Sequence, residues 1–98
     1  MELIELLKAV KDHTLSKDQL EGFRDEMASL VADMHIEAAE IEKKKAFYWL
    51  DNKKESDIAT ERAWRVTPEG QRLIVLNRYI KACGKVLDSL KSRLYSVY

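Results

Sequence analysis

The chain has 98 residues, of which 46% are hydrophobic and 35% charged, and its formal net charge is zero. A chain of this size predicts one helical domain, residues 1–98, with too little interior for a deep, walled active site. It has one Cys, no apolar run near 18 residues and no basic segment after Met1. We therefore expect no internal disulfide, membrane span or signal peptide, and a reducing cytoplasm as the compartment.

The first expected helix covers about residues 2–12, where Leu3, Leu6, Leu7 and Val10 fall on one stripe. A Ser-x-x-Gln capping box at residues 16–19 then opens a second helix, expected to run to about residue 52. One apolar stripe follows it: Leu20, Phe23, Met27, Leu30, Met34, Ala38, Ile41 and Tyr48.

A polar break over residues 51–56 separates this helix from a short one, which either Ser56 or Asp57 can cap. The apolar side of the short helix is expected to hold Ile58, Ala59, Ala63 and Trp64. The short helix should end before the Thr-Pro-Glu-Gly segment at 67–70, because proline disfavours helix in the residue before it and suits the first helical position.

The final helix is expected from Pro68 to near the C-terminus and has the clearest periodicity in the chain. Its apolar residues step by alternating threes and fours: Leu73, Leu76, Ile80, Cys83, Leu87, Leu90, Leu94 and Val97. Val75, Tyr79 and Val86 widen this seam. The pattern predicts an all-α fold: a long antiparallel helical hairpin with one or two short accessory helices.

No pattern typical of a catalytic, cofactor or metal site is present. His13 and His35 are 22 positions apart, and neither belongs to a Glu-x-x-His or His-x-x-x-His pair. Cys83 occupies a seam position, which favours a packing role, and the three glycines are isolated from one another. We therefore expect no enzymatic activity and no cofactor.

The zero net charge conceals a division along the chain. Residues 1–42 contain 11 acidic and 4 basic side chains, a net of −7, whereas residues 43–98 contain 6 acidic and 13 basic ones, a net of +7. One interpretation is that antiparallel helices pair these charges. The other is a basic surface that binds phosphates or an acidic partner.

The candidate binding residues come from the basic half and from the aromatic side chains within it. Three consecutive aromatics at 47–49 cannot all face one core, which leaves Trp49 as a candidate partner contact. The basic surface, with Trp64 as a stacking residue, would add Trp64, Arg65, Arg72, Arg78, Lys81 and Lys85. Solubilising charges paired with the acidic helix explain the same cations equally simply.

Residues 67–70 (Thr-Pro-Glu-Gly), followed by residues 72–79 (Arg-Leu-Ile-Val-Leu-Asn-Arg-Tyr), resemble temperate-phage anti-RecBCD proteins of the Abc family. The length agrees over essentially the whole chain. The resemblance implies a non-catalytic protein of the host cytoplasm that binds the RecBCD helicase–nuclease through its RecC subunit. It implies an altered Chi response that favours phage recombination, and a host prolyl isomerase acting at Pro68.

Two other functions remain open from the residues alone. The basic half could serve a recombination accessory that binds nucleic acid, or the seam could serve a self-associating coiled-coil module.

Overall fold

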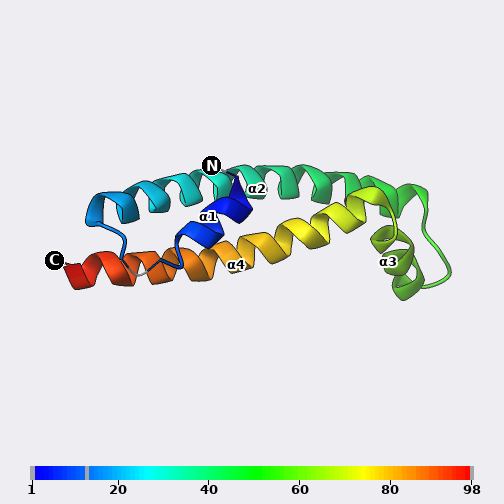
Figure 1. Ribbon diagram of the computed structural model, residues 1–98. Helices are drawn as coiled ribbons and strands as arrows, with labels where there is room; N and C mark the ends of the chain where they lie inside the picture. Colours follow the sequence, from blue (N-terminus) through cyan, green and yellow to red (C-terminus); the bar gives the residue numbers. More distant parts are fainter. Residues whose placement is uncertain (1, 13, 98) are drawn as a thin grey trace. The chain divides into compact units, whose positions relative to one another are not determined.

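The computed structural model describes residues 2–12 and 14–97, with the backbone alone for Ser96 and Val97. The described chain forms α1 (Leu3–Ala9), α2 (Lys17–Asp51), α3 (Asp57–Arg65) and α4 (Pro68–Val97), and it contains no strand (Figure 1). Helices α2 and α4 pack as an antiparallel hairpin, and α1 and α3 are the accessory helices. This confirms the predicted fold class. His13 and the side chain of Val97 lie outside the described residues.

The predicted helix starts are confirmed by their capping hydrogen bonds. At the start of α2, the Ser16 N–H donates to Gln19 Oε1 at 2.9 Å and the Gln19 N–H donates to Ser16 Oγ at 3.2 Å, a reciprocal capping box. Of the two candidate caps for α3, Ser56 is the one used, since its Oγ accepts from the Ala59 N–H at 3.1 Å. Thr67 caps α4, and the bond to Pro68 is trans.

The chain divides into two compact units, and each contains part of α2 and part of α4. We call residues 1–33 and 80–98 the terminal unit, and residues 34–79 the α3 unit. The prediction of a single domain stays a prediction, because this division follows the packing of the chain and does not measure cooperative unfolding.

The terminal unit packs α1 with the first half of α2 and the second half of α4. Its buried apolar side chains are Leu6, Val10, Leu20, Met27, Cys83, Leu90 and Leu94. The full burial of Cys83 confirms its predicted packing position, and this burial raises the pKa of its thiol. The seam member Leu87 is only half-buried.

The α3 unit has a smaller core between the second half of α2, α3 and the first half of α4. Its buried side chains are Ala38, Ile41, Thr60, Trp64, Leu73 and Leu76. The predicted apolar side of α3 is partly wrong, because Ile58 is 67% exposed while Thr60 is fully buried. Thr60 can be buried because its hydroxyl donates to the Ser56 carbonyl and accepts from the Lys54 N–H, each at 3.0 Å.

Within the described residues, none of the helices is both long enough and apolar enough to span a membrane.

Candidate functional site

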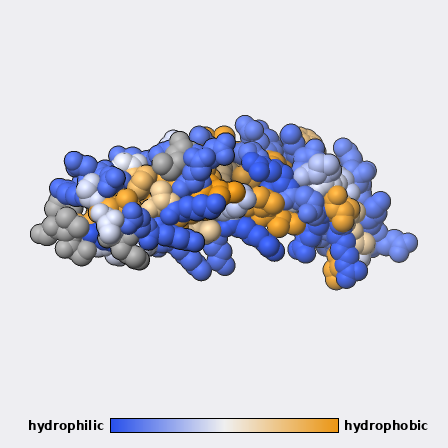
Figure 2. All heavy atoms as spheres, in the orientation of Figure 1, coloured by the Kyte–Doolittle hydropathy of each residue, from blue (hydrophilic) through white to orange (hydrophobic). Residues whose placement is uncertain are grey.

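Exposed hydrophobic side chains gather in the α3 unit. Among the described residues it holds six of the eight large ones that are exposed: Ile36, Phe47, Leu50, Ile58, Val66 and Val75. Figure 2 shows hydrophobic atoms at the surface over α3. The α3 unit is therefore the better candidate for a partner-binding surface.

Trp64, predicted as a partner contact, is instead a core residue. Its side chain is 3% exposed, and its ring lies 5.5 Å from the ring of Tyr48, tilted by 57°. A side chain buried this completely cannot stack on a partner without unfolding its surroundings. That prediction is wrong for Trp64, and the residue acts in packing α3 against α2.

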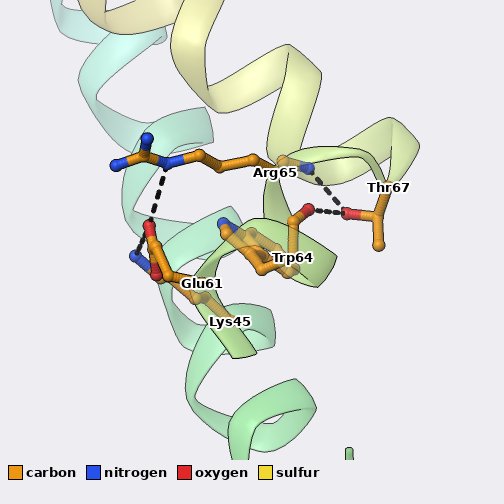
Figure 3. Close-up of polar contacts among 6 residues, drawn as sticks. Lys45, Glu61, Trp64, Arg65 and Thr67 are labelled. Atoms are coloured by element: carbon orange, nitrogen blue, oxygen red, sulfur yellow. Dashed lines mark hydrogen bonds and ion pairs between the residues drawn. The ribbon is translucent and has the colours of Figure 1, made fainter. Parts of the chain in front are cut away.

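The turn that follows Trp64 closes on the Trp64 carbonyl group. Thr67 Oγ1 donates to this carbonyl oxygen at 2.6 Å and accepts from the Gly70 N–H at 3.0 Å (Figure 3). A methyl group on Gly70 would overlap the Trp64 carbonyl oxygen and lie 3.0 Å from Arg65 Cα. Gly70 is therefore needed because two backbone segments approach each other closely.

Arg65 belongs to a small charged cluster on the same unit. Glu61 Oε1 accepts from Lys45 Nζ at 3.0 Å and from Arg65 Nε at 3.4 Å (Figure 3). Burial raises the pKa of Glu61, but the hydrogen bond from Lys45 and the charges of Lys45 and Arg65 together outweigh it and lower the pKa. The side chain of Arg65 remains 63% exposed, so it is still accessible to a partner.

Trp49 lies beside a hollow on the surface of the α3 unit, as its prediction as a contact residue requires. The hollow has a volume of about 480 Å³ and is lined by Trp49, Asp57, Ile58, Glu61, Arg62 and Arg65. We call it the Trp49 hollow. The Trp49 Nε1–H is buried and has no hydrogen-bond acceptor in the structure. Such a donor is costly to leave unpaired.

Arg72 forms an ion pair within the α3 unit. Its Nε donates to Glu37 Oε2 at 2.6 Å and its Nη2 to Glu37 Oε1 at 3.0 Å, a bidentate pair between α4 and α2. The hydrogen bond from Arg72 lowers the pKa of Glu37, and the hydrogen bond from Glu37 raises the pKa of Arg72. A partner would have to compete with Glu37 for this guanidinium.

The other predicted contacts are exposed. Pro68 and Arg78 lie on the surface of the α3 unit, whereas Lys81 and Lys85 are exposed in the terminal unit. None of the three cations forms an ion pair among the described residues. The structure thus brings Trp49 and Arg65 together in one hollow and does not bring the other predicted residues to it.

The division of charge along the sequence largely disappears in each unit. The terminal unit contains 8 basic and 9 acidic residues, and the α3 unit contains 9 basic and 8 acidic residues. Each unit draws on both the acidic and the basic half of the chain, so neither has a large net charge. This supports the interpretation in which antiparallel helices combine complementary charges.

The terminal unit has a different polar feature, which the sequence did not reveal. Arg93 on α4 donates to the Val10 carbonyl oxygen at 2.5 Å and to the Asp12 carbonyl oxygen, both in the segment that follows α1. A hollow of about 380 Å³ lies beside it, lined by Leu7, Val10, Lys11, Val86, Ser89, Leu90 and Arg93. Arg93 therefore ties the end of α1 to α4.

Among the described residues, no group of three or more His, Cys, Asp or Glu side chains could hold a metal ion. Comparison with known proteins adds no assignment: no family model matches the chain, and neither a curated protein nor a solved structure matches it.

Proposed function

We propose that this is a non-catalytic, phage-encoded protein that binds host RecBCD, through its RecC subunit, and uses the Trp49 hollow as its contact surface. The observation that carries the binding role is the hollow itself, which is lined by Trp49, two arginines and the exposed Ile58. The choice of partner rests on the resemblance of residues 67–79 to the Abc family. Binding would alter the Chi response and favour phage recombination in the host cytoplasm.

The hollow has the chemistry of a protein contact. Tryptophan and arginine are the side chains that most often dominate binding energy, and both line it. Arg62 is exposed, forms no ion pair in the described chain and can meet a carboxylate at the rim.

The charge distribution favours protein binding over nucleic-acid binding. Nucleic-acid affinity comes mainly from cations that neutralise phosphates. The α3 unit has a net charge of only +1, with 9 basic and 8 acidic residues, and Glu37 and Glu61 engage three of its cations. A protein partner can use the mixture of apolar and charged groups at the hollow.

The test is the affinity of purified RecBCD for the protein and for Trp49→Ala, measured by calorimetry. We expect at least a tenfold loss, because truncation removes the central aromatic contact. Trp49→Phe, which keeps a ring but no N–H, should show an intermediate loss. Tyr95→Ala is the matched control, since Tyr95 is an aromatic residue of the terminal unit with 68% exposure. Equal affinity of Trp49→Ala and the parent protein would overturn the proposal.

A host prolyl isomerase is the second proposed partner, at Pro68. Pro68 is exposed at the start of α4, where an enzyme can reach it. We expect added isomerase to accelerate the association of the parent protein with RecBCD and to have no effect on Pro68→Ala. Stopped-flow association with and without isomerase distinguishes this from a proline that serves only as a helix start, for which neither protein would respond.

A further inference from the structure

Helix α2 has a second apolar stripe, whose residues are all exposed. Residues 36, 40, 43, 47 and 50 step by four, three, four and three, so they line one side of the helix. They are Ile36, Glu40, Lys43, Phe47 and Leu50, which we call the α2 outer seam. Ile36, Phe47 and Leu50 are 60, 64 and 79% exposed. The exposed Ala39 and Ala46 flank the same face.

The two charged members of the outer seam have opposite signs and lie symmetrically about the point midway between residues 41 and 42, as do Ile36 and Phe47. Glu40 and Lys43 are both exposed, and neither forms a hydrogen bond or ion pair in the described chain. Each is flanked on its outer side by a large apolar residue, Ile36 before Glu40 and Phe47 after Lys43. Read in the opposite direction, residues 36–47 of the seam therefore present apolar groups in the same places and the opposite charges, whereas Leu50 would face Asp33.

We propose that the α2 outer seam binds the outer seam of a second copy of this chain, with the two helices antiparallel. A two-fold axis midway between residues 41 and 42 would place Ile36 opposite Phe47 of the second copy. It would also place Glu40 opposite Lys43 of the second copy, twice by symmetry. Isologous contacts of this kind require a self-complementary surface, which residues 36–47 of the outer seam provide.

The positions of the two charges also explain why a parallel pair of α2 helices is disfavoured. In a parallel pair with equal register, Glu40 would face Glu40 and Lys43 would face Lys43. Like charges placed opposite each other at a helix contact are destabilising. The charged pair thus selects the antiparallel arrangement, while Ile36 and Phe47 supply the apolar contact.

The contact is short, so the dimer should be reversible. From residue 36 to residue 47, the part of the seam that is paired, the helix rises by about 16 Å. A contact between two helices over this length falls at the small end of specific interfaces, where association is weak. We expect the chain to be monomeric when dilute and dimeric when concentrated.

The dimer is independent of the proposed RecBCD contact. None of the outer-seam residues lines the Trp49 hollow, and none of the lining residues of the hollow belongs to the outer seam. Failure of RecBCD binding would leave the dimer unaffected, and the reverse also holds.

The experiment measures the dimer dissociation constant by sedimentation equilibrium. Glu40→Lys and Lys43→Glu should each weaken dimerisation at least tenfold, since each leaves two like charges opposite each other at both pairs. A one-to-one mixture of the two variants should recover a dimer. In that mixed dimer, the lysine introduced at position 40 of one chain faces the glutamate introduced at position 43 of the other.

The matched controls make the same charge changes next to the seam. Glu42→Lys and Lys44→Glu alter exposed residues of α2 outside the α2 outer seam and should leave the dissociation constant unchanged. The proposal of a dimer is overturned if the parent chain stays monomeric up to millimolar concentration. The antiparallel register is overturned if mixing Glu40→Lys with Lys43→Glu fails to restore association.

Discussion

The terminal unit and the α3 unit use the same two long helices but differ in what they bury. The terminal unit encloses large apolar side chains, with Leu6, Met27 and Leu90 fully buried, and Arg93 ties α1 to it. The α3 unit buries fewer aliphatic side chains and keeps six large hydrophobic ones exposed, among the residues described. Apolar residues that would add to a core are thus placed where they can contact other molecules.

The comparison separates a unit suited to stability from one suited to binding. Both proposed contact surfaces, the Trp49 hollow and the α2 outer seam, lie in the α3 unit. If this division of roles is correct, substitutions in the terminal unit should change stability and leave binding intact in the folded protein. Surface substitutions in the α3 unit should do the reverse.

The largest effect is expected in the terminal core. Leu90→Ala removes a fully buried side chain and should lower the free energy of unfolding by about 2–5 kcal/mol. Leu87→Ala, on the same helix, should cost less, about 1–2 kcal/mol, because Leu87 is only partly buried. Urea denaturation of both variants measures the difference, and equal losses would show that Leu90 is not the better packed residue.

Gly70→Ala should be the most damaging single-methyl change in the α3 unit. The added methyl group would overlap the Trp64 carbonyl oxygen, so α3 and α4 must separate, at about 3 kcal/mol. Gly84→Ala is the control: apart from the adjacent residues and the nearby backbone of its own helix, no atom lies within 4 Å of its methyl group, and alanine favours the helix by up to about 1 kcal/mol. Thermal unfolding should shift in opposite directions for the two variants. A stabilised Gly70→Ala would refute the close approach.

Arg93→Ala tests how α1 is held in the terminal unit. Loss of the bonds to the Val10 and Asp12 carbonyls should cost about 2 kcal/mol. Amide hydrogen exchange should then accelerate in α1 more than in α2. Lys85→Ala, an exposed cation of the same unit, should leave the exchange unchanged. Unaltered exchange in α1 would mean that its apolar contacts alone keep it in place.

The smallest effect on stability is expected from lowering the pH. Because the pKa values of Glu37 and Glu61 are lowered by folding, these groups stabilise the protein fully above the unfolded value of about 4.3. That contribution is lost as the pH falls through the lower, folded values. Melting temperature measured against pH should therefore fall less steeply for Glu37→Gln than for Glu42→Gln, which alters an exposed carboxylate without an ion pair.

The sequence predicted the helices because their ends are marked by local chemistry. Two helix starts are specified by capping residues close together in the sequence, Ser16 with Gln19 and Thr67 with Pro68. Because these hydrogen bonds join near neighbours, they can be predicted without knowing the fold. The α4 seam was also predictable, since a long regular spacing leaves one choice of buried face.

The side chains of the short helix could not be assigned in this way. A nine-residue helix has too few turns to define a face, so the burial of Trp64 and the exposure of Ile58 depend on where α3 lies against α2. The need for Gly70 and the reach of Arg93 depend on contacts between segments distant along the chain. The Trp49 hollow exists only once α3 is in place, so the run of three aromatics could not predict it.

The near-neutral units have a consequence for how the chain finds its fold. Before folding, the first 42 residues have a net charge of −7 and the remainder +7, and these halves become adjacent only through hairpin closure. Their attraction draws the unfolded chain toward the native topology and falls off beyond about 10 Å at 0.1 M salt. Salt should therefore slow refolding more than it accelerates unfolding. The charge division along the sequence would then affect the folding rate more than the stability of the folded state.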